Sequence, residues 1–139
     1  MKILNESSEG MGSKWIATGS WLAALAVIAG AFGAHALKNV LNERYMHAYQ
    51  TAVTYHLFHS LAIILCGILP SSLHTRRIRM AYRFFLAGLI LFSGSLYVLS
   101  IFAGNGYDSF SRIGVITPFG GLCFISGWIM IAAATRKSA

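Results

Sequence analysis

Residues 84–103 read FFLAGLILFSGSLYVLSIFA, a run without a single charged side chain. In a helix, about 20 apolar residues cover the ~30 Å hydrocarbon core of a bilayer, because each residue rises 1.5 Å. The run therefore has the length and the composition of a membrane-spanning helix, and it predicts an integral membrane protein.

Three more stretches of this kind occur in the chain. Counted together, the uncharged stretches hold 23, 31, 24 and 23 residues, at positions 15–37, 45–75, 84–107 and 113–135. Only 11% of the 139 residues are charged, whereas soluble domains average about a quarter. We predict an all-α fold, a four-helix transmembrane bundle with spans near residues 15–35, 50–69, 84–103 and 117–134.

The segments around the spans are short and polar. Residues 1–14 show no regular apolar period and are expected to be a frayed tail, and residues 136–139 a second tail, so that residues 15–135 form a single domain. Thr117 and Pro118 mark the start of the fourth span, as a helix cap and a first helical position. Between the first two spans, apolar side chains at helical spacing predict a short interfacial helix: Leu37, Val40, Leu41, Tyr45 and Tyr49.

The first span has one alternative interpretation. Ala34, His35 and Ala36 have the A-x-A form of a signal-peptidase site, which is typical of a cleaved leader. The apolar run is longer than the 7–15 residues of a leader, and later spans supply helical partners. We therefore expect the first span to be retained.

Basic residues predict the orientation in the membrane. Four spans place both termini and the connection between spans two and three on one side, which holds eight Lys and Arg residues against three on the other. Because Lys and Arg accumulate in cytoplasmic segments, both termini are expected in the cytoplasm. The densest cluster is expected to contact anionic lipid headgroups: Arg76, Arg77, Arg79 and Arg83.

The net charge of +7 does not indicate nucleic-acid binding. A nucleic-acid interface would need a basic patch on a soluble face with stacking aromatics, and here the basic residues flank apolar spans. Membrane lipids are the expected partners.

Small residues recur at helical spacing inside the spans. Helices in lipid gain little from hydrophobicity when they associate, so close packing of small residues contributes much of their stability. The same pattern serves contacts within one chain, in a homo-oligomer or in a larger membrane complex. The residues expected at helix contacts are Gly30, Gly33, Ala34, Gly94, Gly120, Gly121 and Gly127.

His59 lies near the middle of the second span, where an ionisable group needs a partner or a water-filled cavity. In one interpretation it is a packed histidine that bonds the hydroxyl of Ser93 or Ser95. In the other it belongs to a proton-relay or ligand site in a pocket that opens toward the outer surface. The candidate residues of that polar site are His59, Tyr55, Ser93, Ser95, Tyr97 and His35.

Catalytic and metal-binding patterns are missing from the sequence. Its four carboxylates, Glu6, Glu9, Glu43 and Asp108, lie outside the spans, so no carboxylate pair or metal cluster is expected there. The histidines of span two share one helix and are poorly placed as two axial haem ligands. We therefore expect no enzyme, no metal and no cofactor. The two cysteines, Cys66 and Cys123, are interpreted as small buried residues.

Several motifs, taken in order, resemble a known family: GAFGAH at residues 30–35, FSGSLY at 92–97, and Tyr55 with His59. Thr117 with Pro118, and a glycine pair at 120–121, continue the match. They resemble the YgdD-like family, small bacterial inner-membrane proteins classed as domain of unknown function 423. The resemblance implies a four-span protein of the bacterial inner membrane and brings no activity. His56 departs from the family pattern, which favours His59 as the shared residue.

Two functions remain open at this level. The first is a non-enzymatic protein that acts through helix contacts, as an accessory, assembly or homo-oligomeric membrane protein. The alternative is a protein that binds or transports a small molecule, a proton or a lipid at the polar site around His59.

Overall fold

The structure is a computed structural model that describes residues 2–70, 73, 76–103 and 105–135. Within these residues, four helices are long and apolar enough to cross a membrane: Gly10–Leu37, Glu43–Ile68, Arg76–Ala103 and Arg112–Ala134. The prediction of an all-α bundle with four spans is confirmed.

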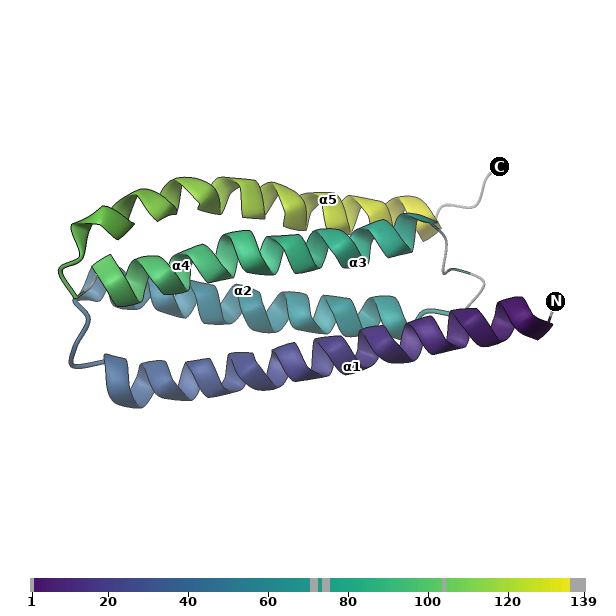
Figure 1. The fold of residues 1–139 in the computed structure, drawn as a ribbon, viewed down its shortest axis with the longest axis horizontal. Helices are drawn as coiled ribbons and strands as arrows, with labels where there is room; N and C mark the ends of the chain where they lie inside the picture. The colour runs from purple at the N-terminus through teal and green to yellow at the C-terminus, as the bar shows by residue number, and fades with distance from the viewer. Residues whose placement is uncertain (1, 71–72, 74–75, 104, 136–139) are drawn as a thin grey trace.

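The helices form two close pairs that meet along the middle of the bundle (Figure 1). Helix α1 (Lys2–Phe32) packs along α2 (Glu43–Ile68), and α5 (Thr117–Thr135) packs along α3 (Arg76–Gly88). Helix α2 also contacts α3, so that these two are the central helices. The start of α1, the end of α2, the start of α3 and the end of α5 lie at one end of the bundle (Figure 1). We call it the basic end, because Lys14 and Arg76 lie there, and the other the opposite end.

Helix α1 begins at Lys2, so the described part of the expected tail, residues 2–14, continues into the first span as one helix. No proline interrupts this segment, and α1 already approaches α2 at Gly12, three residues before Trp15. A Cβ atom on Gly67 would lie 2.7 Å from the carbonyl oxygen of Gly12, which shows how closely α2 approaches α1 there. Trp15 then stacks on Tyr82 of α3, with ring centroids 4.9 Å apart. Packing on α2 and α3 thus extends the helix beyond the apolar run.

The predicted interfacial helix between spans one and two is wrong. Leu37 ends the first helix, Val40 and Leu41 lie in a turn, and α2 starts at Glu43 and continues unbroken to Ile68. The side chain of Asn42 accepts a hydrogen bond from the backbone N–H of Tyr45 at 3.1 Å. This cap satisfies a free amide and fixes the start of α2. The apolar residues that predicted one short helix therefore belong to two elements, Leu37 to the end of the first span and Tyr45 and Tyr49 to α2.

Three segments of the spans have wider, π-helical turns. One is Gly33–Leu37 at the end of the first span, and two lie in the third, at Leu89–Gly94 and Leu99–Ala103 on either side of α4 (Ser95–Val98). A π-helical turn inserts a residue and re-aims the side chains that follow it. Side chains of the third span therefore point in directions that differ from those in a regular α-helix.

Several of the glycines expected at helix contacts are sites of close approach. A Cβ atom on Gly33 would lie 2.6 Å from the ring of Tyr49, and one on Gly127 would lie 2.5 Å from the ring of Phe85. At Gly120 an added Cβ would overlap the backbone of the third span. Gly94 and Gly121 differ, because an added Cβ would have its nearest neighbours at 3.7 and 3.9 Å, which is ordinary contact. Their helices do not require glycine for packing.

At the basic end, Arg77 has a partner within the chain. Its guanidinium donates a hydrogen bond of 2.6 Å to the carbonyl oxygen of Ala133, near the end of α5. The last carbonyls of a helix lack intrahelical partners and carry partial negative charge, so a cation there is stabilising. Arg77 therefore joins α3 to α5, although all four arginines of the cluster are exposed. Contact of these four arginines with lipid headgroups stays a prediction.

Candidate intramembrane binding site

A crevice of about 300 Å³ lies between α2 and α5. Its lining is mostly aromatic and comprises Thr54, Tyr55, Phe58, His59 and Trp128. Tyr55 is twelve residues into α2 (55 minus 43), which corresponds to about 18 Å along the axis. The crevice therefore lies near mid-membrane depth, where water is scarce.

His59 is held by two hydrogen bonds on the wall of this crevice. Its Nδ1 lies 2.9 Å from the carbonyl oxygen of Tyr55, and the indole N–H of Trp128 donates to its Nε2 at 3.4 Å. A carbonyl only accepts, so Nδ1 carries the proton and Nε2 is the acceptor. This tautomer is neutral and uses both ring nitrogens, which suits a side chain that is only 6% exposed.

The predicted hydrogen bond between His59 and a serine is wrong. Ser95 donates to the carbonyl oxygen of Phe92 at 2.9 Å and lies 3.0 Å from the hydroxyl of Thr117. Ser93 is buried, and its hydroxyl has no partner among the described residues. Both serines belong to or border the π-helical segment Leu89–Gly94, whose altered turn could not be foreseen from spacing.

Aromatic rings fix the position of the His59 ring. Phe124 stacks on it with centroids 3.5 Å apart and planes 11° apart. Tyr55 stacks on both Phe92 and His59, with ring centroids 4.5 Å and 5.8 Å apart. Such stacks hold ring geometry and contribute beyond simple burial. The wall of the crevice is therefore a packed aromatic cluster.

The six candidate residues of the polar site do not share one pocket. Tyr55 and His59 line the crevice, whereas Tyr97 bonds His56, with its hydroxyl 3.2 Å from the ring nitrogen Nδ1. His35 is exposed, and it lines neither of the two cavities described here. The six residues of the predicted single pocket thus form separate polar contacts, and Tyr55 and His59 are the two of them that line the crevice.

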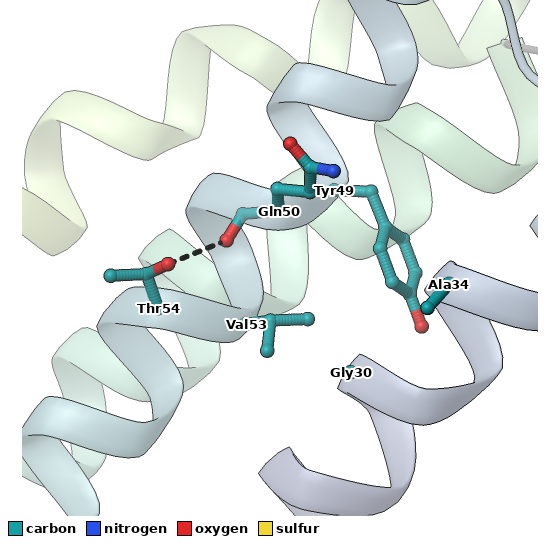
Figure 2. A pocket seen from close by; sticks show the side chains of 7 residues that line it. Gly30, Ala34, Tyr49, Gln50, Val53 and Thr54 are labelled. Carbon is teal, nitrogen blue, oxygen red and sulfur yellow. Dashed lines mark hydrogen bonds between the residues drawn. The ribbon is translucent and has the colours of Figure 1, made fainter. Parts of the chain in front are cut away.

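A second groove, of about 370 Å³, lies between the end of the first span and the start of α2 (Figure 2). The ring of Tyr49 reaches from α2 toward Ala34 (Figure 2), and its hydroxyl donates to the carbonyl oxygen of Ala29 at 2.9 Å. The Thr54 hydroxyl bonds the backbone carbonyl of Gln50 at 2.9 Å. The lining comprises Gly30, Gly33, Ala34, Tyr49, Gln50, Val53 and Thr54.

Two polar groups on these cavities are uncommitted. Among the described residues, none forms a hydrogen bond with the amide side chain of Gln50 or the hydroxyl of Tyr55. An unpaired polar group away from water costs free energy, so each can bind a partner that enters the cavity. Metal binding has no comparable basis, because the described residues contain no cluster of three or more His, Cys, Asp or Glu.

Three residues of the site were missed from the sequence. Phe58 and Phe124 are ordinary apolar residues of spans, and nothing in their spacing sets them apart. Trp128 carried a weak signal, because tryptophan prefers the membrane interface and this one falls inside a span. A tryptophan N–H at that depth needs an acceptor, and His59 is that acceptor.

Comparison with known proteins gives the family. The family described as "Protein of unknown function (DUF423)" matches residues 29–121. The chain is 38% identical over 125 residues to the UPF0382 membrane protein SAB0533 of Staphylococcus aureus, covering 90% of this chain and 97% of that protein. It is 40% identical over 124 residues to the UPF0382 membrane protein YwdK of Bacillus subtilis, covering 88% and 96%. No solved structure matches. The resemblance to domain of unknown function 423 is therefore confirmed, and this chain belongs to that family of membrane proteins.

Proposed function

We propose that this protein is a non-enzymatic membrane protein that binds an apolar ligand with a hydrogen-bonding group in the crevice around His59. The observation that supports it best is the uncommitted hydroxyl of Tyr55, which lines a crevice of about 300 Å³ near mid-membrane depth. A hydroxyl at this depth gains a hydrogen bond only from a ligand, a lipid or a trapped water.

The surroundings of His59 support binding over catalysis. Both of its ring nitrogens are engaged, one by Tyr55 and one by Trp128. The chain has only four carboxylates, and none follows a catalytic pattern with this histidine. In this proposal His59 orients the Trp128 indole, and the aromatic walls give the crevice its shape.

The accessory, assembly or homo-oligomeric role has less support. Its motivation was the set of small-residue faces, and Gly33, Gly120 and Gly127 pack against Tyr49, Phe92 and Phe85 of this same chain. These contacts hold the bundle together and leave fewer small residues for another protein.

Binding can be tested by fluorescence from Trp128. In the double variant Trp15→Phe, Trp21→Phe, Trp128 is the only one of the three tryptophans that remains. The probe is a monoacylglycerol brominated in the middle of its acyl chain, diluted into nanodiscs of unbrominated lipid, because bromine quenches tryptophan on contact. Quenching is expected to saturate at a low mole fraction and to be reversed by unbrominated monoacylglycerol. Tyr55→Phe should raise the half-saturating mole fraction about fivefold, through loss of one hydrogen bond.

Trp21 provides the matched control. It is 75% exposed and lines neither cavity, so a variant that keeps only Trp21 should be quenched in proportion to the probe, without saturation. If Trp128 also responds in simple proportion, the crevice has no preference over bulk lipid and the proposed function is wrong.

We also propose that the protein lies in the bacterial inner membrane with its basic end toward the cytoplasm. Lys14, Arg76, Arg79 and Arg83 are all exposed at that end, as the positive-inside rule requires of cytoplasmic segments. In a variant with Cys66 and Cys123 replaced by alanine, a cysteine at Asn39 should react with a membrane-impermeant maleimide in intact cells.

The comparison variant in this labelling experiment is Ser13→Cys, because Ser13 is exposed near the basic end. Ser13→Cys should react only after the membrane is permeabilised, and Asn39→Cys should react before. The reverse pattern would place the termini outside and contradict the proposed orientation.

A further inference from the structure

The groove beside α1 and the crevice beside α5 meet at one residue. Thr54 lines both. Gln50, Thr54 and Phe58 follow one another at intervals of four, which places them on one stripe of α2. From Gln50 to Phe58 this stripe covers eight residues, or about 12 Å along the helix axis. The two cavities are therefore neighbours along the exposed side of α2, and together we call them the trough.

The two parts of this trough differ in chemistry. The groove near the opposite end carries the amide of Gln50, which both donates and accepts hydrogen bonds, and no residue of its lining is charged. The crevice nearer mid-membrane presents the rings of Phe58 and Trp128. One part thus suits an uncharged headgroup, and the other suits a hydrocarbon chain that begins with a hydrogen-bonding group such as an ester, which the Tyr55 hydroxyl can meet.

The depths of the two parts match the polarity of a lipid. Helix α2 has 26 residues and is about 39 Å long, longer than the ~30 Å hydrocarbon core. Gln50, seven residues after Glu43, lies about 10 Å from the helix start, in the outer half of the hydrocarbon of that leaflet. The crevice at Tyr55 and His59 lies deeper. A ligand in the trough would have its polar group nearer the interface and its chain nearer the membrane centre.

We infer that the trough binds one long-chain amphiphile with an uncharged, hydrogen-bonding headgroup, the headgroup between α1 and α2 at Gln50 and the chain in the crevice at Trp128. This inference rests on the proposed function and names its ligand class. Gly30 and Ala34 belong to the site because their small side chains leave the groove open on the α1 side.

The test measures the effect of the groove on quenching at Trp128. Gln50→Leu removes the amide but keeps a similar volume, and Ala34→Leu fills the groove from α1. Each is expected to raise the half-saturating mole fraction of brominated monoacylglycerol about tenfold. Ala31→Leu is the matched control, because Ala31 is also an exposed alanine of the first span and does not line the groove. It should leave binding unchanged, and unfolding of each variant in mixed micelles checks that the bundle is intact.

Three probes with the same brominated chain separate this inference from the proposed function. Monoacylglycerol should bind more tightly than a phosphoglycerol amphiphile, whose anion finds no cation in the groove lining, and more tightly than the bare bromoalkane. If the monoacylglycerol and the phosphoglycerol amphiphile saturate alike and Gln50→Leu has no effect, the crevice binds the ligand without a headgroup site at Gln50, and the inference is overturned while the proposed function stands. If none saturates, the proposed function fails as well.

Discussion

Gly120→Ala is expected to destabilise the bundle by about 3 kcal/mol, the upper part of the range for overpacking a close contact. An added Cβ at Gly120 would overlap the backbone nitrogen of Phe92 and lie 2.8 Å from the carbonyl carbon of Leu91. Backbone atoms of a packed helix cannot rotate away as a flexible side chain can. Helix α5 would have to move away from the third span, and the contacts along the whole pair would weaken.

Gly121→Ala is the matched control for this substitution. The neighbouring glycine lies in the same helix, and an added Cβ there would be 3.9 Å from the ring of Phe92. It should change the free energy of unfolding by at most about 1 kcal/mol, in the stabilising direction, since alanine is the better helix former. Both values can be measured by reversible unfolding in mixed micelles. Equal effects of the two variants would show that α5 does not pack through Gly120.

Phe124→Ala is expected to cost about 3 kcal/mol, near the low end for a buried phenylalanine. Phe124 is 3% exposed and stacks directly on His59, so its removal leaves a void beside the histidine and frees the neighbouring rings. The cost lies at the low end because lipid chains solvate the ring when the helices separate, and what is lost is mainly packing.

Phe119→Ala tests the same chemical change on the lipid-facing side of α5. Phe119 is 62% exposed, so its loss should change the unfolding free energy by less than about 0.5 kcal/mol.

Phe124→Ala should also abolish saturable quenching of Trp128, because His59 would no longer be held in place as the acceptor of the indole N–H. If Phe124→Ala has the same free energy of unfolding as the wild type, the aromatic cluster contributes little to the bundle.

The fold was largely predictable because of the cost of charge in hydrocarbon. Eleven basic and four acidic residues are distributed so that four long stretches remain free of them, and a helix is the structure that satisfies every backbone group of such a stretch in lipid. The ends of the helices were less predictable. The close approach of α1 to α2 at Gly12 and Gly67 lies just before the apolar run, and the apolar pattern of α1 alone does not contain that contact.

The candidate site was predictable only in part. The sequence indicated that His59 needs a partner, because an ionisable ring within a span cannot remain unpaired. It could not indicate the partner. Serines near the same depth were reasonable acceptors, but π-helical turns in the third span redirect Ser93 and Ser95, and Trp128 comes within reach from α5 instead.

The sequence by itself therefore determined the membrane environment, the number of spans and the need for polar pairing at His59, because these follow from the solvation of individual residues. Only the tertiary structure decided which glycines are indispensable, which side chain pairs with His59 and where two cavities meet at Thr54. Those properties depend on the distances between atoms of different helices, and these distances are set by packing that no single segment encodes.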